Sequence, residues 1–319
     1  MRRIPWTNLI TERHVGDTST RRCGMSARRY AQVDVFTTRA GYGNALAVVL
    51  DADGIDDESM QRFAAWTNLS ESAFVLAPTS PGADFRVRIF TPRQELPFAG
   101  HPTVGATHAL LEAGRLPSDR TDFVLECAAG VLPVRIDDSS GSRCIYVQAP
   151  TPKLAPPDST LIEPLSKALG AAPVSVPRVV DVGAVWLIAE LENAQTVRSL
   201  KPDQVLVAGI TTRTKSVGVS VFGREFSAED AAIAVRAFCP ADGIDEDPVT
   251  GSANAAIGAY LHASGGLASI GSRYCASQGR EVARNGYVHV EVDPESGAVM
   301  IGGACVTCIE GTMRFGTEP

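Results

Sequence analysis

An internal repeat constrains the fold of this chain more than any other feature of its sequence. Residues 84–92 (DFRVRIFTP) resemble residues 232–240 (AIAVRAFCP), with an offset of 148 positions. Residues 99–110 (AGHPTVGATHAL) resemble residues 250–261 (TGSANAAIGAYL) with an offset of 151, so the second copy has three extra residues in its connecting loop. Self-similarity at this spacing predicts two units of like structure within one chain.

Each copy has the same physical pattern. Apolar residues alternate along 84–90 and again from about 231, as in a strand, and the Phe-x-Pro that follows ends the strand because proline has no N–H to donate. The capping pattern at 227–232 favours a helix start, but the repeat favours a strand from about 231, and we follow the repeat. A glycine then precedes a segment rich in Ala and Gly, predicted to be helical at 101–113 and 252–263. Helices with so few bulky or charged side chains are expected to be buried and surrounded by strands.

Strands dominate the rest of the chain. They are predicted at 32–37, 45–50, 72–77, 122–126, 131–136, 143–148, 177–190, 216–222 and 285–302, the last with a turn at 293–297. Further helices are expected at 56–67 and 160–169.

The predicted fold class is α+β, with two pseudo-symmetric domains that each wrap a strand-rich, barrel-like sheet around a central helix. The Pro-rich stretch 150–157 is the natural linker, so we expect domains at 30–150 and 151–304. The last strand, about 305–317, is a candidate to return to the first domain.

Composition excludes several classes of function. A net charge of -7 and a pI near 5.3 discourage binding to nucleic acid or to anionic membranes, and no run of ~20 apolar residues predicts a membrane span. Seven irregularly spaced cysteines fit reduced thiols, so a cytoplasmic location is expected. The spacing Cys305-x-x-Cys308 suggests a metal or redox site, but the segment resembles a strand, on which residues three apart point to opposite faces, and there is no second cysteine pair. The five histidines show no ligand spacing, so no metal or cofactor is expected. Residues 1–29 are expected to be a disordered extension, and Met25 resembles a second possible start.

Two equivalent helices that begin after a glycine predict a ligand site between them. Related by a pseudo-two-fold axis, they can face each other with their N-termini, where free N–H groups and the positive end of the helix dipole bind anions. Gly100 and Gly251 could merely allow tight packing, but polar residues follow both at matched positions, His101 and Ser252. A substrate carboxylate or an enolate oxygen would lie between these helices.

Three further residues are candidates for this site. Asp247 lies five residues before Ser252, where it could orient His101 or accept a substrate hydroxyl, although acidic residues near a helix start are also simply stabilising. Glu71 stands at a loop-to-strand junction, where partial burial would raise its pKa and let it exchange a proton near neutral pH; a solvated loop glutamate is the competing interpretation. Asn44 could offer an amide to the cleft, although turn chemistry in GYGN also explains it.

At these residues the sequence resembles the PhzF family of phenazine-biosynthesis-like isomerases, which share the diaminopimelate epimerase fold. The matching motifs are VDVFT at 33–37, GN at 43–44, NLSES at 68–72, RIFTP at 88–92, ELPFAGHPT at 95–103, EDPVTGSA at 246–253 and QG at 278–279 followed by Arg284. The departures are Ala45, where the family usually has proline, and Ala283, where glycine is common.

The resemblance implies a specific activity and assigns residues to it. The family's best-known reaction is isomerisation of trans-2,3-dihydro-3-hydroxyanthranilate by a homodimer without metal or organic cofactor. The family's general acid/base glutamate matches Glu71, and its histidine, aspartate and serine match His101, Asp247 and Ser252. The remaining expected substrate-binding positions are Asn44, Gly100, Thr250 and Gly251. The expected partner is a small carboxylated substrate, with cyclic amino-acid-like compounds among the candidates.

Two alternatives remain beside the isomerase. An amino-acid epimerase of the two-base kind would need a thiol on each side of the substrate, immediately before the matched glycines; Ala99 and Thr250 stand there instead. A non-catalytic small-molecule-binding protein of the same fold would need no ionisable group at Glu71, whereas the enzyme requires one.

Overall fold

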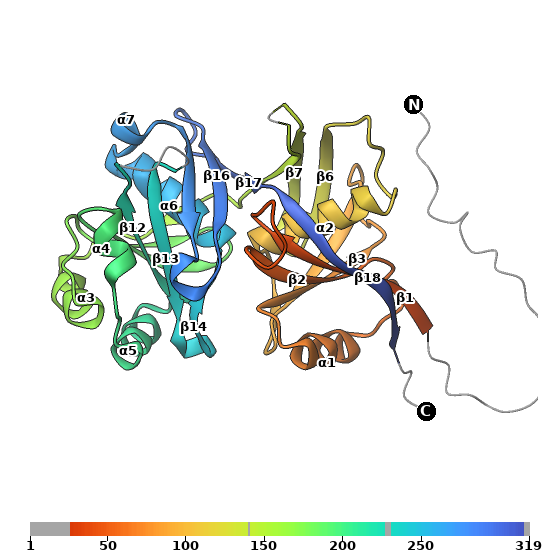
Figure 1. Cartoon of the computed structure of the whole chain (residues 1–319), viewed down its shortest axis with the longest axis horizontal. Helices are drawn as coiled ribbons and strands as arrows, with labels where there is room; N and C mark the ends of the chain where they lie inside the picture. The colour runs from red at the N-terminus through yellow and green to blue at the C-terminus, as the bar shows by residue number, and fades with distance from the viewer. Residues whose placement is uncertain (1–25, 140, 227–230, 316–319) are drawn as a thin grey trace, which may run out of the picture.

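Two similar halves stand side by side in the computed structural model, which describes residues 26–139, 141–226 and 231–315 (Figure 1). The predicted extension lies outside the described residues as far as position 25. Residues 26–29 do not follow that prediction, because they begin a strand that is paired along its whole length with the last strand of the chain. Within the described ranges, no helix combines the length and apolar character needed to cross a membrane.

The first half contains most of the chain up to residue 148. Its strands are β1 (Ser26–Val35), β2 (Asn44–Val49), β3 (Glu71–Leu76), β4 (Phe85–Phe90), β5 (Glu95–Leu96), β6 (Asp122–Cys127), β7 (Gly130–Asp137) and β8 (Cys144–Gln148). They surround helix α2 (Gly100–Glu112), which is buried over almost its whole length, as its Ala- and Gly-rich composition predicts. Helix α1 (Asp57–Thr67) packs on the outside of this sheet through Met60, Phe63 and Ala64.

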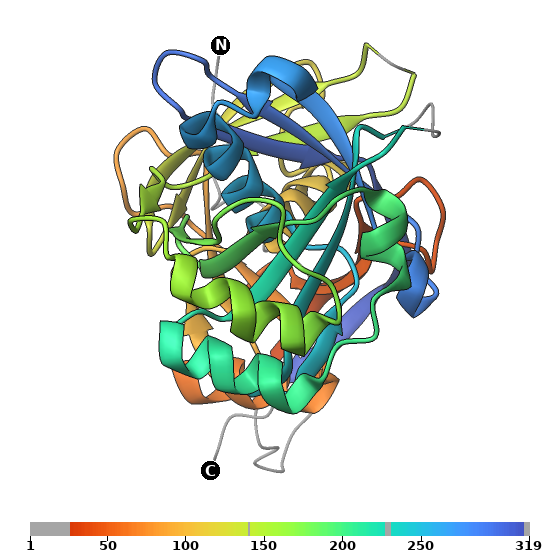
Figure 2. The same ribbon diagram turned by 90° about the vertical axis from the view of Figure 1, so that its left-hand side faces the viewer.

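The second half repeats this plan around helix α6 (Gly251–Ser264), which is likewise buried. Its strands are β9 (Lys153–Leu154), β10 (Arg178–Asp181), β11 (Val185–Glu190), β12 (Gly218–Arg224), β13 (Ile233–Cys239), β14 (Ile244–Asp247), β15 (Arg273–Gln278), β16 (Gly286–Val292) and β17 (Val299–Gly303). Three helices cover the outer face of β11–β13: α3 (Ile162–Leu169), α4 (Ala194–Ser199) and α5 (Gln204–Thr214). Figure 2 shows α3 and α5 as this outer layer. The short helix α7 (Leu267–Ile270) follows α6.

Strand pairing joins the two halves into one sheet. β8 of the first half pairs antiparallel with β17 of the second, and β18 (Cys305–Phe315) then returns to pair with β1 (Figure 1). The cores of the two halves are accordingly continuous. The central helices are therefore held in a fixed relation to each other by hydrogen-bonded strands.

Equivalent ion pairs in the two halves confirm that the sequence repeat is also a repeat in the structure. Arg88 on β4 binds Glu95 with Nε and Nη2 at 2.7 Å each, and Arg236 on β13 binds Glu246 in the same forked way at 2.9 and 2.6 Å. These four residues are equivalents in the two sequence copies. Each ion pair binds the segment before a central helix to the neighbouring strand.

The sequence reasoning missed several elements of the second half, including strand β14 and the short helix α7. The single strand predicted at 177–190 is two antiparallel strands, β10 and β11, because Gly183 adopts φ +92° and reverses the chain between them. Helices α4 and α5 were not expected, and their N-caps, Asn193 and Asp203, are the local signals that announce them. Strand β15 was also missed.

Candidate active site

The two central helices meet at their N-termini, at Gly100 and Gly251. A Cβ placed on Gly100 would lie 3.2 Å from the Cα of Gly251, and one on Gly251 would lie 3.1 Å from the backbone nitrogen of His101. Each contact is tighter than ordinary van der Waals packing and involves backbone atoms. Glycine is therefore required at both positions for the helix starts to approach this closely.

The first turn of each helix keeps its N–H groups available. The residue before α2 is Ala99, which has no side-chain donor or acceptor, and the residue before α6 is Thr250, whose hydroxyl binds Asp247 instead of capping the helix. Neither first turn contains an acidic residue. Two positive helix ends thus converge without a protein anion among them in the first turns, which suits the carboxylate of a ligand.

Glu71 and His101 face each other beside this junction. Glu71 is the first residue of β3, and its Oε2 lies 3.4 Å from Nε2 of His101, the second residue of α2. Both atoms are buried, and neither has a hydrogen-bond partner among the described residues. Buried polar atoms are normally hydrogen-bonded, so two neighbouring buried atoms without a hydrogen bond fit a site where a substrate supplies the missing partners.

Burial sets the charge of this pair. It raises the pKa of Glu71 well above its ordinary value, and the negative charge of Asp247 raises it further. Burial also lowers the pKa of His101 to about 3. At neutral pH the histidine is therefore a neutral imidazole, so the 3.4 Å contact is not an ion pair, and Glu71 is poised to hold or release a proton.

Asp247 is fixed from both sides. Its Oδ1 accepts a hydrogen bond from Nδ2 of Asn44 at 3.0 Å, and its Oδ2 accepts one from Oγ1 of Thr250 at 2.5 Å. Burial raises the pKa of Asp247 to about 6, although these two donors oppose that rise. Because both oxygens already accept hydrogen bonds, Asp247 is the carboxyl that ionises first, and its charge keeps the proton on Glu71.

A buried amide supports this arrangement and was missed by the sequence reasoning except as part of a motif. Oε1 of Gln278 accepts from the backbone N–H of Thr250 at 3.0 Å, and its Nε2 donates to Oγ1 of Thr250 at 2.9 Å. The Thr250 hydroxyl therefore directs its own proton to Asp247. Asn254 binds the same Oε1 at 3.1 Å, which ties β15 to the first turns of α6.

Trp186 is the second site residue that sequence reasoning missed. It lies on β11, is almost fully buried, and donates from Nε1 to Oγ of Ser252 at 3.0 Å. No local pattern singled it out, because a tryptophan in an apolar strand is ordinarily core.

All the residues predicted for the site are brought together by the fold. Asn44, Asp247 and Thr250 form one hydrogen-bonded group, Glu71 and His101 form a contact pair, and the two glycines touch, with Ser252 next to Gly251. Ser70 extends the first group by donating to Oδ1 of Asn44 at 3.2 Å. The described residues contain no group of three or more His, Cys, Asp or Glu side chains placed to hold a metal ion.

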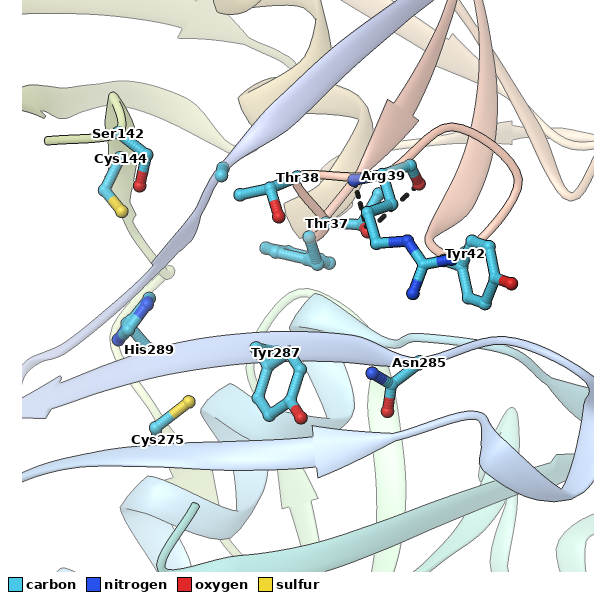
Figure 3. A pocket seen from close by; sticks show the side chains of 12 residues that line it. Thr37, Thr38, Arg39, Tyr42, Ser142, Cys144, Cys275, Asn285, Tyr287 and His289 are labelled. Carbon is cyan, nitrogen blue, oxygen red and sulfur yellow. Dashed lines mark hydrogen bonds between the residues drawn. The ribbon is translucent and has the colours of Figure 1, made fainter. Parts of the chain in front are cut away.

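A separate cavity lies where the two halves adjoin (Figure 3). It has a volume of about 380 Å³, and Arg39 and Tyr42 of the β1–β2 loop face Tyr287 and His289 of β16 across it. None of the residues that line it is an aspartate or glutamate. Neither Glu71 nor His101 is among its lining residues, so this cavity is distinct from the junction of the two central helices.

Comparison with known proteins identifies related sequences. The family model PhzC-PhzF, described as phenazine biosynthesis-like protein, matches residues 33–311. Antisense-enhancing sequence 1 of Schizosaccharomyces pombe is 36% identical over 90% of this chain and 99% of its own length. The trans-2,3-dihydro-3-hydroxyanthranilate isomerase of Pseudomonas aeruginosa is 34% identical over 73% of this chain and 79% of its own length.

Solved structures agree with this relationship. A PhzF-family phenazine biosynthesis protein of Bacillus anthracis superimposes with a TM-score of 0.75 and 27% identity, covering 91% of this chain and 99% of that one. A hydroxyproline epimerase of Agrobacterium vitis shares the fold at a TM-score of 0.63 and 15% identity, covering 92% and 94% of the two chains. The predicted fold class, two half-barrels of the epimerase kind, is confirmed.

Proposed function

This chain is an isomerase of the PhzC-PhzF family, and we propose that it moves a proton between two carbons of a small carboxylated substrate with Glu71 as its general acid/base. The trans-2,3-dihydro-3-hydroxyanthranilate isomerase among its relatives suggests a ring of that kind as the substrate. The observation that carries the proposal is the buried Glu71–His101 pair with its unpartnered atoms, beside two converging helix N-termini.

The proposed reaction is a proton shift that moves a double bond. The Glu71 carboxylate takes a proton from one carbon, and the electrons of that C–H bond enter the conjugated system of the substrate. The carboxyl group of Glu71, whose proton exchanges with solvent while it is held, then delivers a proton to a second carbon and is regenerated as the carboxylate. Its raised pKa makes the carboxylate a stronger base than an ordinary glutamate, which favours removal of a proton from carbon.

The other site residues hold the substrate. Its carboxylate would lie against the Ser252 hydroxyl and the N–H groups at the start of α6, where the helix dipole stabilises it. His101 and Asp247 would bind the amino and hydroxyl groups, since a neutral imidazole can accept or donate and a carboxylate accepts. We further propose that the enzyme acts as a cytoplasmic homodimer without metal or organic cofactor, which light scattering and metal analysis of the purified protein would test.

Conversion of the substrate in deuterated water, followed by NMR of its ring protons, tests this function. Wild-type protein incubated with trans-2,3-dihydro-3-hydroxyanthranilate should convert it, and ring-proton NMR should show the shifted double bond. Glu71→Gln should stop conversion while the substrate still binds, because shape and the anion site persist. Glu58→Gln, the same change at an exposed position of α1, is the matched control and should have no effect.

The two negative outcomes have different meanings. Full turnover by Glu71→Gln would show that another group carries the proton. Failure of the wild-type protein to act on this compound, with binding retained, would reject the ring substrate and leave the acid/base assignment to be tested on other carboxylated compounds.

A further inference from the structure

The duplication assigns a counterpart to Glu71. Ser72 of β3 pairs with Phe90, and Val219 of β12 pairs with Phe238, and the two phenylalanines are equivalents in the repeat. The residue before each is therefore equivalent too, so the second-half counterpart of Glu71 is Gly218.

The neighbouring strands confirm this correspondence. Glu71 lies beside Leu46 in the parallel pair β2–β3, and Gly218 lies beside Trp186 in the parallel pair β11–β12. In the first half an acid lies beside a leucine, and at the equivalent positions of the second half a glycine lies beside a tryptophan.

Gly218 cannot carry a side chain in this structure. A Cβ there would lie 2.5 Å from Cζ3 of Trp186 and 2.6 Å from the backbone oxygen of Phe238. The indole ring therefore fills the space that a side chain equivalent to that of Glu71 would need in the second half.

In the second half, the contact between Trp186 and Ser252 takes the place of the contact between Glu71 and His101 in the first half. Ser252 is the repeat equivalent of His101, so the 3.0 Å bond from Trp186 Nε1 to Ser252 Oγ stands where Glu71 contacts His101. Because Ser252 accepts this bond, its own hydroxyl proton remains available to donate to a carboxylate.

We propose that Trp186 is a specificity-determining residue that confines proton transfer to the Glu71 face of the substrate. This rests on the proposed function and deepens it. Inversion of a stereocentre requires a proton carrier on each side of the carbon. The second half offers no counterpart of Glu71, because an indole, whose N–H is too weak an acid to take this role, fills that space. The substrates are therefore carboxylated compounds whose proton leaves and returns on one face, and compounds that need inversion are excluded.

Deuterium placement tests the inference with a readout that a merely structural tryptophan would not move. In deuterated water the wild-type product should carry deuterium on one face only. Trp186→Leu introduces the residue found at the equivalent position in the first half, removes the cover and admits water. It should place deuterium on both faces and lower kcat/KM about tenfold through loss of the bond to Ser252. Strict one-face labelling by Trp186→Leu would overturn the proposal.

Two further variants serve as controls, one for the loss of a tryptophan elsewhere and one for the loss of the N–H donor alone. Trp66→Leu changes a tryptophan that is 76% exposed on α1 and should leave labelling and rate unchanged. Trp186→Phe keeps an aromatic cover but loses the N–H donor, so it should retain one-face labelling while its KM rises. Two-face labelling by Trp186→Phe would contradict the assignment of the ring as the barrier, even if Trp186→Leu fails to fold.

Fluorescence separates this inference from the proposed function. In a Trp6→Phe/Trp66→Phe background, Trp186 is the sole tryptophan and reports on its own surroundings. Anthranilate, a carboxylated ring that cannot turn over, should change its emission at the concentrations at which calorimetry detects binding. Binding without an emission change would overturn the role of Trp186 and leave Glu71 catalysis intact. An emission change in a protein without isomerase activity would reject the proposed reaction and leave the position of Trp186 supported.

Discussion

The charge of Asp247 should make the protein less stable as the pH rises through the mildly acidic range. Burial raises the pKa of this group to about 6 from 3.8. Between these values the folded protein holds a proton that the unfolded chain has lost, so the folded state binds more protons. Stability therefore falls as the pH increases across this window and levels off above it.

The size of the effect follows from the shift. A rise of about two pKa units at about 1.4 kcal/mol per unit gives a total loss of about 3 kcal/mol. About 2 kcal/mol of it falls between pH 4 and pH 7, because the unfolded carboxyl is already partly ionised at pH 4. Asp247→Asn cannot titrate and should lack this loss. The substitution also weakens the bonds to Asn44 and Thr250, but that cost does not depend on pH.

Urea unfolding of wild type and Asp247→Asn at several pH values provides the assay. The difference between the two free energies of unfolding removes every group that titrates alike in both proteins. This difference should shift by about 2 kcal/mol in favour of the variant from pH 4 to pH 7. Glu71 adds in the same direction, because the charge of Asp247 raises its pKa. A difference that stays flat, or that moves in favour of the wild type, would refute the assignment of Asp247 as a buried carboxyl that ionises at a cost.

Three further predictions concern the rate and the scaffold. Since only ionised Glu71 can take a proton and its pKa is raised, kcat/KM should increase with pH through values above 4.5, and a rate that falls over that range would contradict this role. Gly251→Ala should cost ~1–3 kcal/mol and reduce turnover, because its Cβ meets backbone at 3.1 Å. Gly209→Ala, in open space on α5, is the control and should stabilise by up to ~1 kcal/mol in thermal unfolding. Lys215 caps α5 at φ 53°, so Lys215→Gly should stabilise by about 1 kcal/mol, and no gain in unfolding free energy would argue against strain there.

The sequence predicted the scaffold of the site well because the repeat carried the information twice. Matching glycines, each ahead of a segment poor in bulky side chains, are enough to place two buried helices, and the equivalence of the copies places their starts against each other. The observed contact between Gly100 and Gly251 is the direct consequence.

Residues without a repeat signature were harder to find. Trp186 and Gly218 have no sequence likeness to Leu46 and Glu71, and only the strand register shows that they are equivalent. Gln278 depends in the same way on tertiary structure, since β15 must lie beside β13 before its amide can reach Thr250. Local patterns cannot encode such pairings, because each partner lies far away in the chain.

The two copies agree in the residues that hold the fold and differ at most of the proposed substrate-binding positions. The forked Arg–Glu pair is the same in both halves, whereas Asp247 corresponds to Leu96 and Ser252 to His101. A symmetric site would bind a ligand equally well in two orientations related by the pseudo-two-fold axis. Under the proposed function, with Glu71 in one half, the indole of Trp186 in the other and Ser252 on the carboxylate, only one orientation would bring a C–H bond to Glu71. In the proposed reaction this asymmetry would select both the substrate's orientation and the face on which its proton moves.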